Sequence, residues 1–450
     1  MNKLILKLIF FIGITGTAVY AQSPVDTYIK EGLKNNLVLK QKNIAIDRAL
    51  TALRESKGLF LPSVNFSGTY QSGEGGRYFD FPVGDLINPV YQTLNQLTGT
   101  NNFPQLQNIK SNLNPNNYYD AHIRTSLPII NPDIYYNYKI QQQQVTLSET
   151  QVALYERELV KDIKTAYYNY LMAKSGVEVY ESALKLVEKN LKINQSLFNN
   201  GSGLMANVNR AKAEMEEVNS QLLNAQNQQK NAQYYFNFLL NKGLEDDIML
   251  PEQLDDELQN SLALSSENKT REELELLNLE INVNETVLKM NQKYWIPKIS
   301  AFIDLGSQAS DWAFDSQSRY YFAGVQMDFP IFNGFKNSLK IQQKKLELDN
   351  LNSNRDNITK QLLMSAKVAR NDLETASKKF TASAARIKAA ESYYKVIEKG
   401  YNEGVNSLIE YIDARNQLTA SQLQHTIAKY QLLIAGAALE RETASYTIKK

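Results

Sequence analysis

Two segments of nearly equal length, residues 133–200 and 334–400, contain no proline, and Gly176 is the only glycine between their end residues. Because proline and glycine are the residues that most disfavour a helix interior, each segment is expected to form one nearly continuous helix. At 1.5 Å per residue, such a helix extends over roughly 100 Å. A compact globule does not need two rods of this length, so the sequence predicts an elongated, mainly α-helical protein with a small β part.

Three short sequence landmarks occur twice in the same order, which indicates an internal duplication. Residues 61–66 resemble 296–302, residues 128–131 resemble 330–333, and residues 198–201 resemble 401–404. The distance from Pro128 to Gly201 is 73 residues, and that from Pro330 to Gly404 is 74. We therefore expect a first structural repeat at 22–240, a connecting segment at 241–268, and a second structural repeat at 269–450.

The two repeats differ in the distance between their first and second prolines. This distance is 66 residues in the first repeat (62 to 128) and 33 in the second (297 to 330). The additional residues lie within 73–117, a stretch rich in Asn, Gly and Pro. This composition is typical of turns and loops, so we expect a long surface loop there.

Four short segments alternate between apolar and polar residues, at 64–71, 119–127, 299–305 and 321–329. A period of two residues predicts strands with one buried face, and the segments also have the length of tilted strands that cross a bilayer. A soluble sandwich sheet would show the same pattern. Because membrane barrels need at least about eight strands, four strands could close a barrel only in an oligomer, and three copies would supply twelve.

The first 21 residues have the features of a secretory signal peptide. Lys3 and Lys7 precede an apolar stretch at 9–14, and Val19 and Ala21 are the small residues that a signal peptidase recognises. Cleavage would leave Gln22 as the first residue. An N-terminal membrane anchor is the alternative, but it needs about 20 apolar residues, and polar residues and glycines interrupt this stretch early.

Composition excludes several kinds of chemistry. The 450 residues include no Cys and only two His, His122 and His425, which lie far apart in sequence. Disulfides, thiolate zinc sites, thiol nucleophiles and lipid-anchored cysteines are therefore excluded, and we expect neither a metal nor a cofactor. A net charge of +1 makes nucleic acid a poor partner. No segment gathers a nucleophile, a base and an orienting acid, so an enzyme is not expected.

Residues 400–415 carry the most specific motif: an aromatic residue, two variable residues, glycine, a short linker, an acid, two apolar positions and Asp-Ala. In this motif the chain resembles the TolC family of outer-membrane efflux and secretion ducts. Residues 198–212 are similar through Gly201, Val208, Ala211 and Lys212, although Asn207 stands where the family often has Asp. The resemblance covers essentially the whole chain after residue 21.

The resemblance implies a homotrimer with a twelve-stranded β-barrel in outer-membrane lipid, continuous with a long α-helical barrel in the periplasm. Its helical tip would dock a periplasmic adaptor of an inner-membrane pump, in a tripartite efflux or type I secretion system. The protein would be a passive export duct. The competing hypothesis is a periplasmic adaptor or structural coiled-coil protein without a pore. The resemblance does not specify the exported substrate.

The resemblance also assigns roles to individual residues. Glu410 and Asp413 would form rings of carboxylates at the pore constriction, where crowding would raise some of their pKa values; alternatively, Ser407 and Glu410 form a capping box. Tyr401 would help to hold the tip shut, or would only pack between helices. The polar strand residues His122 and Arg124 would face the barrel lumen. The turns that would dock the adaptor, or serve only as turns, contain Gly201, Gly203, Asn207, Val208, Gly404, Val405, Asn406 and Ser407.

Overall fold

The computed structural model describes residues 23–114, 116–251, 254–262 and 271–448. The expected signal peptide, 1–21, and part of the expected connecting segment, 241–268, lie outside the described residues. The chain divides into two compact units. We call them the helical unit (residues up to Asp47, Thr146–Leu279 and from Leu351 onward) and the strand unit (Arg48–Val145 and Glu280–Asn350).

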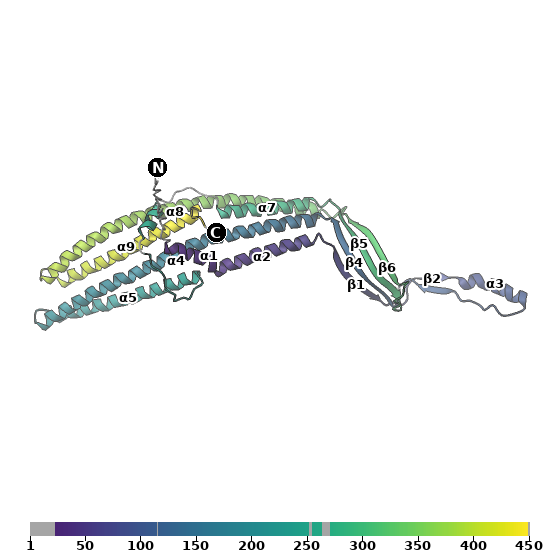
Figure 1. The fold of residues 1–450 in the computed structure, drawn as a ribbon, viewed down its shortest axis with the longest axis horizontal. Helices are drawn as coiled ribbons and strands as arrows, with labels where there is room; N and C mark the ends of the chain where they lie inside the picture. Colours follow the sequence, from purple (N-terminus) through teal and green to yellow (C-terminus); the bar gives the residue numbers. More distant parts are fainter. Residues whose placement is uncertain (1–22, 115, 252–253, 263–270, 449–450) are drawn as a thin grey trace, which may run out of the picture. The chain divides into compact units, whose positions relative to one another are not determined.

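Two very long helices dominate the chain, as the absence of proline predicts. They are α4, with 68 residues, and α8, with 67 residues. Pro132 is the first residue of α4, a position where its missing N–H group has no helical partner to lose. The helices are α1 (Pro24–Asn35), α2 (Leu37–Gly58), α3 (Val83–Thr98), α4 (Pro132–Asn199), α5 (Met205–Leu239), α6 (Asp255–Leu262), α7 (Glu272–Gln292), α8 (Lys336–Asn402) and α9 (Leu408–Thr443) (Figure 1).

An aromatic cluster lies within the hydrophobic core of the helical unit. The rings of Tyr28, Tyr167 and Phe236 lie 4.9 to 5.7 Å apart, and none of the three side chains is more than 1% exposed. They join α1, α4 and α5, and the Tyr28 hydroxyl accepts a hydrogen bond of 2.7 Å from the Met249 N–H group. Among the described residues, no helix combines the length and the apolar character that crossing a membrane requires.

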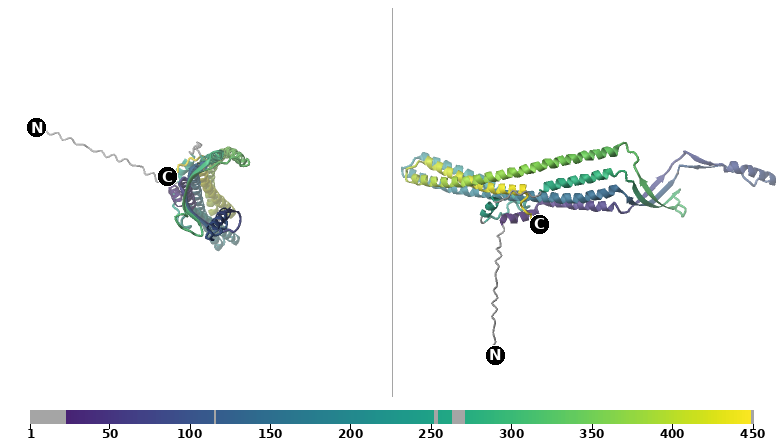
Figure 2. Two further views of the ribbon diagram at one scale, coloured as in Figure 1. Left: turned by 90° about the vertical axis from the view of Figure 1, so that its right-hand side faces the viewer. Right: turned by 90° about the horizontal axis from the view of Figure 1, so that it is seen from above.

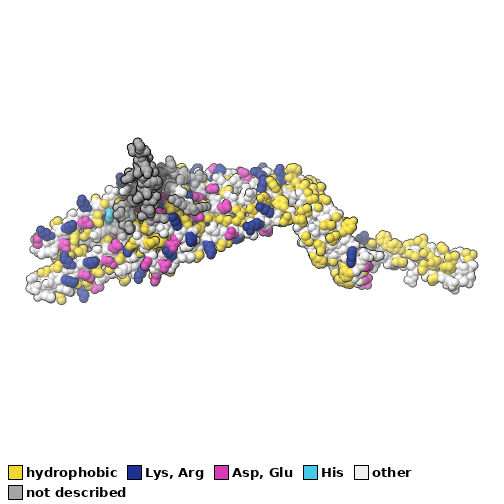
Figure 3. Space-filling model, viewed as in Figure 1, with side chains coloured by type: hydrophobic (Ala, Val, Ile, Leu, Met, Phe, Trp, Pro, Cys, Tyr) yellow, Lys and Arg dark blue, Asp and Glu magenta, His cyan; other side chains and the backbone are white. Residues whose placement is uncertain are grey.

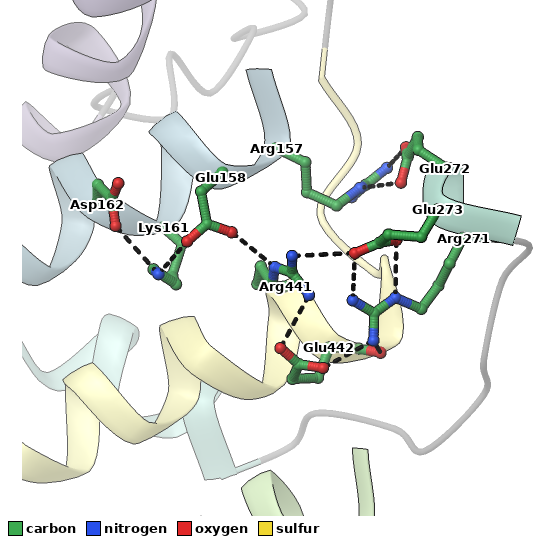
Figure 4. A network of polar contacts seen from close by, with 9 residues as sticks. All are labelled: Arg157, Glu158, Lys161, Asp162, Arg271, Glu272, Glu273, Arg441 and Glu442. Atoms are coloured by element: carbon green, nitrogen blue, oxygen red, sulfur yellow. Dashed lines mark hydrogen bonds and ion pairs between the residues drawn. The ribbon is translucent and has the colours of Figure 1, made fainter. Parts of the chain in front are cut away.

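A network of ion pairs joins α4 to the beginning of α7 and the end of α9 (Figure 4). Arg271, 5% exposed, pairs with Glu442 at 2.7 Å, and Arg441 pairs with Glu158 at 2.8 Å and with Glu273 at 2.9 Å. Burial alone would raise the pKa values of Glu158 and Glu273, but the hydrogen bonds from Lys and Arg outweigh it and leave both below the usual value. The network therefore stabilises the charged forms of these acids.

The strand unit contains a four-stranded antiparallel sheet in the order β1-β4-β5-β6, which confirms the four alternating segments. Its register aligns Phe66, Ile123, Leu305 and Tyr321 across the sheet. This apolar face is exposed in the single chain, and Figure 3 shows hydrophobic side chains gathered over the strands. The strands are β1 (Ser63–Gln71), β4 (Tyr118–Ile130), β5 (Lys298–Ser310) and β6 (Arg319–Asp328).

The loop expected at 73–117 contains regular structure, so that part of the prediction is wrong. Strands β2 (Tyr78–Phe81) and β3 (Ile109–Asn112) pair with each other, and helix α3 (Val83–Thr98) lies between them in sequence. The Asn and Pro content favoured a loop, but Leu86, Val90 and Leu97 recur at helical spacing. Pro89 lies inside α3 and does not end it.

Candidate functional site

The two tip turns have the same backbone geometry. After α4, the Ser202 N–H group donates to the Leu197 carbonyl at 2.9 Å, and Gly201 has a φ of +74°. After α8, the Val405 N–H group donates to the Gly400 carbonyl at 2.8 Å, and Gly404 has a φ of +77°. Each turn is a Schellman motif, in which glycine adopts the left-handed conformation that other residues disfavour.

The helices that leave the two turns begin differently. Ser407 caps α9 in a capping box: its hydroxyl accepts from the Glu410 N–H group at 3.3 Å, and the Glu410 carboxylate accepts from the Ser407 N–H group at 2.7 Å. At the corresponding position before α5, Leu204 offers no side-chain cap. The capping box inferred from the sequence is therefore confirmed, and only the second tip has one.

Glu410 and Asp413 are both exposed on α9. The backbone N–H group of Ser407, followed by the Ser407 hydroxyl and the Asn406 amide, holds the pKa of Glu410 below its ordinary value. Asp413 makes no hydrogen bond or ion pair with any side chain that the structure describes. The rise in pKa expected for crowded carboxylates requires three chains, so it stays a prediction.

Tyr401 packs against the helices around it. Its ring stacks on the ring of Tyr411 at 4.9 Å, and its hydroxyl donates to Oδ1 of Asn194 at 3.1 Å. Asn194 is 2% exposed and belongs to α4, whereas both tyrosines belong to the other hairpin. Tyr401 therefore links the α8–α9 hairpin to the α4–α5 hairpin.

Two ion pairs that were not predicted also link these hairpins. Arg415 on α9 pairs with Glu214 on α5 at 2.8 Å, and Lys189 on α4 pairs with Glu398 on α8 at 3.1 Å. The partners lie about 200 residues apart, so no local pattern could have revealed them. Figures 1 and 2 show the turn ends of the two hairpins at the same end of the helical unit.

Arg415 is the most deeply buried charged residue of this region, at 1% exposure. Its Nη2 group donates to Glu214 and, at 2.7 Å, to Oδ1 of Asn416. Its Nε and Nη1 groups find no acceptor among the described residues. Glu214 also pairs with the exposed Arg210 at 2.9 Å. A buried guanidinium with one carboxylate partner makes the stability of this site depend strongly on that carboxylate.

Both tips expose apolar side chains. Leu204 is 68% exposed, Val405 79% and Ile409 78%. A Cβ atom at Gly203 would come within 3.0 Å of the backbone of Phe198 and Leu197, so this glycine is required for a close turn. The remaining tip residues named from the sequence, Asn207, Val208 and Asn406, are half-buried beside these turns.

His122 and Arg124 lie on the face of the sheet opposite the apolar one. Arg124 donates to both carboxylate oxygens of Asp304, at 2.7 and 2.6 Å, and His122 contacts Asp120 at 3.2 Å. The polar face predicted for these strands is therefore present. Among the described residues, no group of three or more His, Cys, Asp or Glu could hold a metal ion.

A model of the family described as outer membrane efflux protein matches residues 28–241 and 264–444, which is most of the chain. The chain belongs to the outer membrane efflux protein family. No curated protein sequence matches it.

Solved outer-membrane proteins share the fold of this family member. The CmeC channel of Campylobacter jejuni is 15% identical with a TM-score of 0.72, and the match covers 93% of this chain and 85% of CmeC. The VceC protein of Vibrio cholerae is 13% identical with a TM-score of 0.70, covering 93% and 95%. For the MtrE channel of Neisseria gonorrhoeae these values are 14%, 0.70, 94% and 89%. The likeness confirms a mainly α fold with a small β part.

As a member of the outer membrane efflux protein family, the protein is located in the outer membrane, extends into the periplasm and acts as an efflux channel. Proteins of this family are passive ducts and not enzymes. The comparisons give no support to the alternative of a periplasmic adaptor or coiled-coil protein without a pore.

Proposed function

We propose that three copies of the chain assemble into one channel, with a twelve-stranded barrel in the outer membrane and a helical barrel in the periplasm. The free edges of the sheet support this assembly. Strands β1 and β6 are its outermost strands, and each has only one neighbour among the described strands. Since open edges are avoided in membrane sheets, pairing β6 of one copy with β1 of the next closes the barrel.

The tip of the helical unit is the docking surface for a periplasmic adaptor of an inner-membrane pump, in a tripartite efflux or type I secretion system. The exposed apolar side chains of Leu204, Val405 and Ile409 support this assignment, since such groups are enriched at protein interfaces when they cluster. The duplicated turns present two similar sites per copy, one in each repeat (22–240 and 269–450), with the segment 241–268 between the repeats.

The α8–α9 hairpin carries the pore constriction. Three copies bring together six carboxylates from Glu410 and Asp413, which favour cations and repel one another. Tyr401, with its hydrogen bond to Asn194, holds this hairpin against the first one in the closed state. His122 and Arg124 line the polar interior of the barrel. The main observation that supports this position of the constriction is that the carboxylate of Asp413 is exposed and pairs with no described side chain.

Planar-bilayer conductance tests the proposal. The purified protein is expected to form cation-selective channels that divalent cations block, and Glu410→Ala with Asp413→Ala is expected to abolish both the selectivity and the block. Glu403→Ala is the matched control, because Glu403 is an exposed acid of the same tip. If the double variant has the same cation selectivity and divalent block as the wild type, the proposal of carboxylate rings is wrong.

A further inference from the structure

Helix α3 has one face that packs against its own return segment. The side chain of Asn88 exchanges hydrogen bonds of 2.9 and 2.7 Å with the backbone of Leu106, and that of Asn95 exchanges bonds of 2.8 and 3.1 Å with the backbone of Phe103. The ring of Tyr91 contacts the ring of Phe103 at 5.4 Å. These contacts fix the rotation of α3 about its axis, so its other face points away from the return segment.

That other face is an apolar stripe without a partner among the described residues. Leu86 is 71% exposed, Val90 55% and Leu97 79%, and Thr93 is exposed between them. The four residues follow one another at spacings of 4, 3 and 4, which is the spacing of coiled-coil contact positions. We call these four residues the α3 stripe.

The chemistry of the α3 stripe selects another helix as its partner. Coiled-coil spacing matches the surface of a second helix lying nearly parallel, and not a flat lipid surface. Helices that lie on membranes are rich in Lys and Arg, whereas α3 contains neither and has Asp85 as its only charge. A helix of 16 residues is also marginal by itself, so burial of its exposed apolar face would stabilise it.

We propose that the α3 stripe packs against the same stripe of the two other copies of this chain, forming a three-helix cap. This inference rests on the proposed homotrimer. The segment that contains α3 follows β1, a sheet edge at which neighbouring copies would meet, so the threefold assembly supplies two equivalent helices to each α3. Layers of Leu86, Val90 and Leu97 would then be buried about the threefold axis, at the ends of the strands away from α2 and α4.

Cysteine crosslinking in isolated outer membranes tests the cap, and because the chain has no native Cys, each introduced thiol is the only thiol of its copy. Under mild oxidation, Leu97→Cys is expected to give covalent dimers, because two of three facing thiols can pair. The matched control is Gln92→Cys, which is exposed on another side of α3 and is expected to stay monomeric on denaturing gels. Leu86→Cys provides a second test position if Leu97→Cys impairs folding.

A native gel of the same samples distinguishes the failure of the cap from the failure of the trimer. If the native complex is a trimer but Leu97→Cys and Leu86→Cys form no covalent dimers, or crosslink no more than Gln92→Cys, the cap is wrong and the trimer stands. Crosslinks from these positions only to a different protein would equally overturn the cap. A native monomer would overturn the trimer and the cap together.

Discussion

Removing the carboxylate of Glu214 should loosen the two tip hairpins, because it leaves Arg415 buried without a counter-charge. The Arg415 side chain is 2% exposed and that of Glu214 is 15% exposed. Removing one partner of a buried ion pair costs about 3 to 5 kcal/mol. Because Glu214 keeps some solvent contact and Asn416 still accepts from Nη2 of Arg415, we expect Glu214→Ala to lie at the lower limit, about 3 kcal/mol.

Hydrogen exchange of the purified protein measures this cost locally. Since every 1.4 kcal/mol is a factor of ten, amides of residues 211–218 and 411–418 should exchange about 100-fold faster in Glu214→Ala than in the wild type. Arg210→Ala is the matched control. It removes the other partner of Glu214, but the Arg210 side chain is 63% exposed. An exposed pair contributes at most about 1 kcal/mol, so exchange should rise less than about fivefold.

Equal acceleration of exchange in Glu214→Ala and Arg210→Ala would show that burial does not set the cost of losing either pair. A paired replacement provides a further check. In Arg415→Met with Glu214→Leu, two apolar side chains replace the ion pair, and exchange should return to within about tenfold of the wild type, since such replacements are often neutral in free energy. If the double variant exchanged as fast as Glu214→Ala, the loss would reflect packing and not an uncompensated charge.

Two further predictions concern the helical unit. Ser407→Ala removes the cap of α9 and should destabilise its first turn by about 1 kcal/mol, which would raise hydrogen exchange at residues 408–410. Leu204→Ala, at the equivalent uncapped position, should leave hydrogen exchange at the start of α5 unchanged. Equal effects of the two variants would contradict the capping role of Ser407. Folding lowers the pKa values of Glu158 and Glu273. Their contribution to the stability of the fold is therefore complete at pH values above the unfolded-state pKa of about 4.3, and it is lost as pH falls through the folded-state pKa values. The thermal unfolding temperature should therefore fall between pH 5 and pH 3, and by less in Arg441→Gln; an equal fall in both proteins would exclude the network as its cause.

The parts of the fold that could be predicted are those encoded by local patterns. Proline-free segments predicted α4 and α8, two-residue alternation predicted the four strands, and the spacing of Ser407 and Glu410 predicted the capping box. Helix α3 was missed because its Asn and Pro residues outweighed its apolar spacing in the prediction. The pair of Arg415 and Glu214 could not be predicted, because only the folding of two distant hairpins brings these residues together.

The two hairpins, α4–α5 and α8–α9, share the same turn but differ in the side chains that follow it, and this difference bears on the proposed pore constriction. The left-handed glycines and the turn hydrogen bonds recur in both, as expected if they are needed to reverse the chain. At the positions of Glu410 and Asp413, by contrast, the first hairpin has Asn207 and Arg210. The capping box accounts for Glu410. It does not account for Asp413, which lies beyond the first turn of α9, where a carboxylate gains little from the helix dipole. Asp413, an exposed acid that neither caps a helix nor pairs with a described side chain, therefore supports the proposed pore constriction more strongly than Glu410 does.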